Sequence, residues 1–107
     1  MFDSNRSDLL KRTILKAKSE DRLVIGLINS IDYLYSTEPN KVLAVALTDS
    51  SSNRLSQTIL ETYCFENGIP FIKTESKILK RLMVFFGCHY QDDSCCVVIT
   101  VSILKKL

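Results

Sequence analysis

The segment TILETYCFENGIPFI, residues 58–72, limits the possible folds of this chain more than any other stretch. Three of its residues recur on one side at helical spacing: Leu60, Tyr63 and Cys64. Asn67 and Gly68 follow and tolerate a positive φ, which commonly ends a helix, and a short apolar run comes next. A helix joined so closely to a buried strand predicts a layered α/β domain.

The rest of the chain alternates between helical and strand patterns. Apolar residues at helical spacing predict helices at residues 7–20, 27–37, 55–66 and 76–86. Short apolar runs predict strands at residues 22–25, 42–47, 69–73 and 95–101. The run VLAVAL does not alternate, which is typical of a strand covered on both faces, so we expect it to be central. This order predicts an α/β fold, a three-layer α/β/α sandwich around a mixed, mostly parallel sheet of about four or five strands.

Length and composition indicate one ordinary globular domain, residues 1–107. The formal net charge of +2, from 14 Lys and Arg against 12 Asp and Glu, is too small to indicate nucleic acid by itself. The bases nevertheless form two groups along the chain: Arg6, Lys11, Arg12, Lys16, Lys18 and Arg22, and then Lys73, Lys77, Lys80 and Arg81. Solvated helix faces are the favoured interpretation of both groups, and a weak basic patch is the alternative.

The sequence also predicts where the protein is located. No apolar run approaches the roughly 18 residues that span a bilayer, and the polar start MFDSNRSD lacks the apolar core of a signal peptide. We therefore expect a protein inside the cell with no membrane partner. The adjacent cysteines of the last predicted strand must point to opposite faces, which is unsuited to a disulfide framework and predicts reduced thiols.

We expect no catalytic residue, no metal and no cofactor, and hence no enzyme. Residues of the type that bind zinc are few: Cys88, His89, Cys95 and Cys96. They form two adjacent pairs that diverge, whereas structural zinc sites use spaced pairs such as CxxC. Asp92 and Asp93 share an open polar loop, where both carboxylates stay solvated and ionised instead of dividing acid and base roles.

Two of the predicted helices carry more apolar residues than one buried face requires. The surplus residues are Ile28 and Tyr35 on the second helix, and Leu55 and Ile59 on the third. Such a surplus predicts a surface for a partner or for self-association, with wider core packing as the alternative.

Three segments resemble the growth arrest and DNA-damage-inducible (Gadd) family of stress proteins. They are Ile25-Gly26 with Ser30, Leu34 and Pro39-Asn40-Lys41-Val42; the helix end Cys64-Phe65-Glu66-Asn67; and the last strand from Asp93 to Thr100. The resemblance covers about residues 22–102. The family belongs to a superfamily of small α/β/α proteins that includes kink-turn RNA-binding ribosomal and ribonucleoprotein components.

The resemblance implies a non-catalytic regulator of stress response and growth arrest in the nucleus and cytoplasm. Members dimerise through their central helices and bind a MAP kinase kinase kinase and cell-cycle or DNA-repair proteins, so the four surplus apolar residues become the expected homodimer surface. The family's acidic partner loop corresponds here to TDSSSNR, which contains Asp49, Asn53 and Arg54 but only one acid. This departure weakens the expectation of kinase contacts through that loop.

RNA binding is the alternative function that the resemblance implies. Kink-turn proteins begin their second helix with Gly-x-Asn-Glu, whose side chains reach sheared bases. Here Gly26 is followed by Leu27, Ile28 and Asn29, so the Asn comes one position late and no Glu follows it. The RNA contacts expected under this alternative are Gly26, Asn29 and Lys41.

Overall fold

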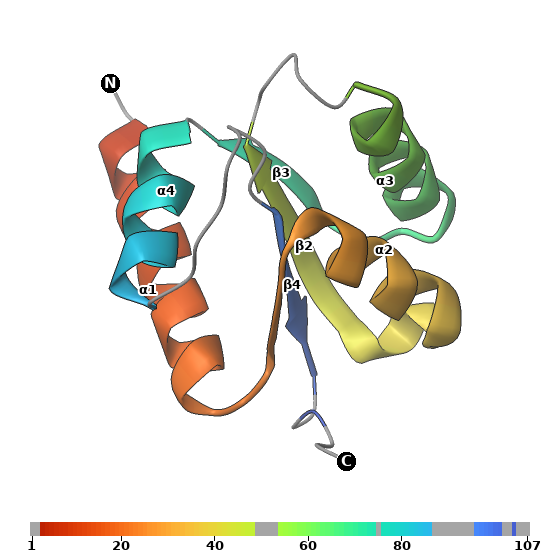
Figure 1. The fold of residues 1–107 in the computed structure, drawn as a ribbon, viewed down its shortest axis with the longest axis horizontal. Helices are drawn as coiled ribbons and strands as arrows, with labels where there is room; N and C mark the ends of the chain where they lie inside the picture. Colours follow the sequence, from red (N-terminus) through yellow and green to blue (C-terminus); the bar gives the residue numbers. More distant parts are fainter. Residues whose placement is uncertain (1–2, 49–53, 75, 87–95, 102–103, 105–107) are drawn as a thin grey trace.

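The computed structural model describes residues 3–48, 54–74, 76–86, 96–101 and 104 and confirms a mixed α/β fold with four α-helices and a four-stranded mixed sheet in this part of the chain (Figure 1). The helices are α1 Asp3–Ser19, α2 Leu27–Ser36, α3 Arg54–Glu66 and α4 Ser76–Phe85, with a short 3₁₀ helix, η1, at Pro39–Lys41. The strands are β1 Leu23–Ile25, β2 Val42–Thr48, β3 Phe71–Thr74 and β4 Cys96–Thr100.

The strands lie in the order β1-β4-β2-β3. β2 has neighbours on both sides, as its unbroken apolar run predicts. Its pairing with β3 is parallel, whereas β4 runs antiparallel to both β2 and β1. The expectation of a mostly parallel sheet is therefore not confirmed for the described strands. Its physical basis was the crossover rule, which governs connections between parallel strands and does not require the last strand to run with the others.

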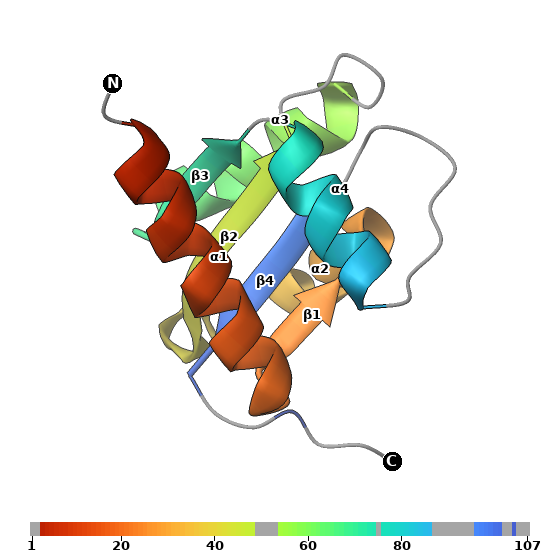
Figure 2. The same cartoon turned by 90° about the vertical axis from the view of Figure 1, so that its left-hand side faces the viewer.

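Helices cover both faces of the sheet. α1 and α4 lie over one face and α2 and α3 over the other (Figures 1 and 2). Because side chains alternate along a strand, Ala46 of β2 joins the core beneath α1 and α4, and the adjacent Val45 joins the core beneath α2 and α3. Three residues of α1 at helical spacing are buried in the first of these cores: Leu10, Ile14 and Ala17.

Two element boundaries differ from the sequence prediction. α1 begins at Asp3, four residues before the predicted start of this helix. β3 begins at Phe71 instead of residue 69, because the preceding Pro70 has no N–H for a ladder. The Pro70 carbonyl still accepts a hydrogen bond of 3.0 Å from the Val45 N–H, which leads the chain into the parallel pairing.

The predicted stop after α3 is confirmed. Gly68 has a φ of 68°, a left-handed conformation that glycine adopts without a Cβ penalty. The Ile69 N–H donates to the Cys64 carbonyl at 2.9 Å, and Ile69 is buried. The turn thus satisfies one of the last carbonyls of α3 and directs the chain toward β3.

Among the described helices, none combines the length and the apolar character that crossing a membrane requires.

Candidate functional site

α2 exposes one apolar flank beside its buried face. Ser30 and Leu34 are buried against the sheet, whereas Ile28 is 74% exposed and Tyr35 is 62% exposed. Ile28 and Tyr35 are seven residues apart, which places them on the same side of the helix two turns from each other. The half-buried Ile31 lies between them on that flank, so the apolar surface of α2 continues from the core outward.

α3 presents a matching flank. Gln57, Leu60 and Cys64 are buried. Leu55 is 76% exposed, and Ile59, one turn later, is half-buried. The same spacing continues to Tyr63, so three residues at i, i+4 and i+8 form one side of the helix.

Tyr63 joins the two flanks. Its hydroxyl donates a hydrogen bond of 2.8 Å to the Leu34 carbonyl near the end of α2. Its ring also lies edge-on to the Tyr35 ring, with centroids 5.1 Å apart. This bond satisfies a carbonyl in the last turn of α2 and holds the carboxyl ends of the two helices together.

The two helices run in the same direction, so their exposed residues lie together. Both begin at the end of the sheet where β4 starts: the Gly26 N–H bonds the Cys96 carbonyl, and Leu47, near the end of β2, pairs with Cys96. The structure thus brings all four surplus apolar residues onto neighbouring flanks of α2 and α3. We call Ile28, Tyr35, Leu55 and Ile59 the apolar strip. Ile59 is the least exposed of the four.

Of the three residues predicted for the partner loop, the structure describes only Arg54. Arg54 is exposed and opens α3, next to Leu55 at the end of the apolar strip. Asp49 and Asn53 lie outside the described residues.

The three residues expected to contact RNA do not form one site. Gly26 bonds Cys96 at the start of β4, whereas the Lys41 carbonyl accepts a bond from the Val101 N–H just past its end. Five residues of strand separate these two points, a distance of roughly 17 Å at about 3.3 Å per residue. The Asn29 amide also donates to the Ile25 carbonyl at 3.0 Å, so part of its bonding capacity serves the entry to α2.

The sequence analysis missed the most exposed aromatic residue of α3. Phe65 is 87% exposed and lies on the opposite flank of the helix from the apolar strip. Helical spacing could have shown this, because Phe65 is five residues from the buried Leu60 and therefore points outward.

The described residues show little that could act on a substrate. Burial raises the pKa of the Cys64 thiol to about 11, so the group stays protonated near neutral pH and is a poor nucleophile. Within the described part of the chain, no three His, Cys, Asp or Glu residues gather in a way that could hold a metal ion. Cys88, His89, Asp92, Asp93 and Cys95 lie outside the described residues.

A shallow hollow of ≈ 520 Å³ lies beyond the carboxyl ends of α2 and α3. Its lining consists of Glu38, Pro39, Asn40, Val42, Asn67, Gly68 and Ile69. The side chain of Asn67, one of the lining residues, donates a hydrogen bond of 2.8 Å to the Tyr63 carbonyl. The hollow therefore lies next to the end of the apolar strip where Tyr35 and Tyr63 meet. The hollow is open and contains a single carboxylate, so it extends the surface without adding reactive groups.

The fold and the apolar strip together define an α/β protein with an exposed apolar surface. Neither a scan of protein-family models nor a search of curated proteins gave a match to this chain.

Proposed function

We propose that this chain is a non-catalytic regulator that acts by protein–protein contacts, with the apolar strip as its contact surface. One observation carries the proposal: Ile28, Tyr35 and Leu55 are each more than 60% exposed and lie on adjoining flanks of two locked helices. Large apolar side chains gathered in this way lose contact with water when a partner covers them, which favours association.

The partner that the strip fits first is a second copy of the chain. A stable interface buries about 800 Å² on each side, more than four side chains supply, so the strip forms its centre and the polar residues around it form the rim. Asp32 and Glu66 are exposed on the same two helices and suit that rim. A twofold axis through the strip would place the same apolar residues opposite one another.

The resemblance to the Gadd family extends this proposal to a biological role. It supports a regulator of stress response and growth arrest in the nucleus and cytoplasm, which binds and activates a MAP kinase kinase kinase and modulates cell-cycle or DNA-repair proteins. It also supports a three-layer α/β/α sandwich as the description of the fold. Kink-turn RNA binding is the weaker function, because the described structure separates Lys41 from Gly26 and Asn29.

Light scattering of the purified chain at tens of micromolar tests the homodimer. We expect a dimer that Leu55→Asp converts to a monomer, with affinity lowered by at least about a hundredfold, because a buried carboxylate at the centre of an interface has no partner. Phe65→Asp is the matched control, since it introduces the same charge on the other flank of α3 and should leave the dimer intact. A monomeric wild-type protein, or equal effects of the two variants, would contradict the dimer.

Co-precipitation then tests the proposed partner. A tagged wild-type chain should recover a MAP kinase kinase kinase from stressed cells, and the Phe65→Asp variant should recover it equally well. If partner and second copy use the same strip, Leu55→Asp will lose both. Recovery of the kinase by Leu55→Asp would separate the kinase contact from the strip.

A further inference from the structure

The two groups of bases that are far apart in the sequence come together in the fold. α1 and α4 lie side by side over one face of the sheet and share a core (Figure 2). The Lys18 Nζ also lies 5.8 Å from the ring centroid of Phe86, just past the end of α4. α1 from residue 9 onward has four bases and no acid, and α4 has three bases and no acid, so this layer concentrates positive charge.

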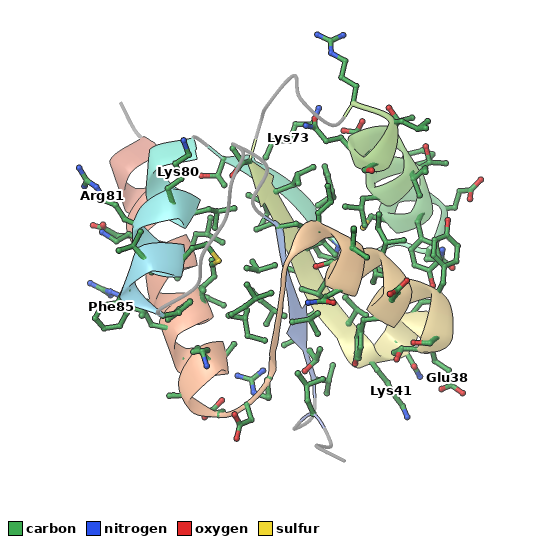
Figure 3. The ribbon with its side chains drawn as sticks, in the orientation of Figure 1. Glu38, Lys41, Lys73, Lys80, Arg81 and Phe85 are labelled. Atoms are coloured by element: carbon green, nitrogen blue, oxygen red, sulfur yellow. The ribbon has the colours of Figure 1, made fainter. Side chains whose placement is uncertain are left out.

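The outward sides of these helices mix bases with large apolar residues. On α1, Leu9, Arg12 and Lys16 recur at i, i+3 and i+7, opposite the residues buried in the core. On α4, Arg81, Val84 and Phe85 recur at i, i+3 and i+4, and Figure 3 shows Arg81 and Phe85 directed away from the sheet. We call these six residues the basic–apolar face. Its apolar members are well exposed: Leu9 65%, Val84 67% and Phe85 75%.

The positive charge of this face is not neutralised by the described residues. Salt bridges join Arg22 to Glu20 and Lys73 to Glu61, and Arg12, Lys16 and Arg81 take part in neither. Asp8 is the one exposed acid on the described first turns of α1. Asp8 lies four residues before Arg12, so a partner with negative charge would meet one competing carboxylate on this part of α1 and none on α4.

The mixture of residues indicates which negative partner fits. A nucleic-acid backbone is contacted mainly by Lys, Arg and polar groups, and it offers nothing to Leu9 or Val84. An anionic bilayer offers both halves of the match, because its headgroups attract Lys and Arg and its acyl boundary accepts Leu, Val and Phe. We propose that the basic–apolar face binds the surface of an anionic lipid bilayer.

This attachment would be peripheral. Helices α1 and α4 would lie along the membrane surface, with their bases at headgroup level and three apolar tips below it. The expectation of no membrane partner came from the lack of a spanning segment, and a surface contact needs no such segment. The basic–apolar face lies across the sheet from the apolar strip, so the proposal does not depend on the proposed function.

Sedimentation of the full chain with vesicles tests the proposal. We expect binding to vesicles of phosphatidylcholine mixed with phosphatidylserine, little binding to phosphatidylcholine alone, and release by salt. Arg12→Glu with Lys16→Glu should lower the partition coefficient by about 25-fold or more, at roughly fivefold for each base lost. Val84→Ser with Phe85→Ser should lower it by about tenfold while the charge is unchanged.

The matched control is Lys41→Glu with Arg54→Glu, which makes the same change in net charge at exposed sites away from α1 and α4. It should alter vesicle binding by less than about threefold, since distant charges are screened. Circular dichroism checks that every variant is folded. Equal binding to both kinds of vesicle, an equal loss in the control, or absence of binding to the mixed vesicles would overturn the proposal. Binding of polyglutamate or single-stranded RNA without binding of mixed vesicles would overturn it in favour of those partners.

Discussion

The two helical layers both leave large apolar side chains in water, but the charges around those side chains differ. Beside the apolar strip, α2 and α3 carry three acids, Asp32, Glu61 and Glu66, and one base, Arg54. Around Val84 and Phe85, and on α1 from Leu9 onward, the charged residues are all bases. Under our two proposals, exposed apolar residues supply the contact on both surfaces, and the bordering charges decide whether that contact is to a protein or to an anionic bilayer.

The cores beneath the two layers differ as well. The described core under α1 and α4 is built of aliphatic side chains and a methionine. The core under α2 and α3 also contains two thiols, Cys64 and Cys96. Within the described residues, each layer has a buried hydroxyl without a hydrogen-bond partner: Ser30 on α2, and Thr48, which lies on the same strand face as Ala46. An unpaired buried hydroxyl costs free energy. The layer that carries the apolar strip thus differs from the other layer in its buried thiols and not in the number of these unpaired hydroxyls.

Truncating one core residue in each layer is the strongest test of this comparison. Leu60 and Leu79 are 1% and 0% exposed, under opposite faces of the sheet. Leu60→Ala and Leu79→Ala should each lower the free energy of unfolding by about 2–5 kcal/mol, because each removes buried methyl groups and leaves a cavity. Urea titration measures this change. An effect below about 1 kcal/mol in one variant would show that its layer is not a packed part of the fold.

Raising the pH should weaken the α2–α3 layer through Cys64. Burial raises the pKa of its thiol from an ordinary 9.0 to about 11. Between these values the unfolded chain loses the proton while the folded protein keeps it, so stability falls as the pH rises through this range and is unaffected below it. The stability advantage of wild type over Cys64→Ala should shrink by about 2–3 kcal/mol between the two pH limits. A constant difference in urea titrations would contradict this assignment.

The smallest expected change in the free energy of unfolding comes from weakening the contact between α2 and α3. Tyr63→Phe keeps the ring beside Tyr35 but removes the hydroxyl that bonds the Leu34 carbonyl. We expect a loss of about 0.5–1.5 kcal/mol in the free energy of unfolding, together with weaker self-association, because the two flanks of the strip lose their fixed spacing. Tyr33→Phe is the control, since Tyr33 also lies on α2 and takes part in neither of these two contacts. Equal losses in both variants would show that the bond contributes nothing specific.

Local patterns predicted most of the elements, because each depends on nearby residues. Helical spacing correctly gave α2 and α3 to within about two residues, and Asn67-Gly68 correctly gave the stop after α3. The direction and position of β4 could not be predicted, since an apolar run such as CVVIT fits either neighbour and either direction.

The apolar strip and the basic–apolar face differ in how much of each could be predicted from the sequence. The apolar surplus on α2 and α3 could be predicted from the spacing of the residues. The contacts by which Tyr63 joins the two helices could not, because they depend on how the helices lie side by side. The basic–apolar face required the fold itself, because α1 and α4 are separated by most of the chain. Sequence distance hides such a face, since each helix alone shows only an ordinary solvated side.

The position of β4 bears on how the protein forms as it is synthesised. β1 and β2 leave the ribosome early, yet they are not neighbours in the sheet, and β4 fills the place between them. Until β4 emerges, β1 lacks the described strand with which it pairs, and only β2 and β3 lie between the two cores. Among the described strands, the sheet therefore closes late, when β4 adds between β1 and β2.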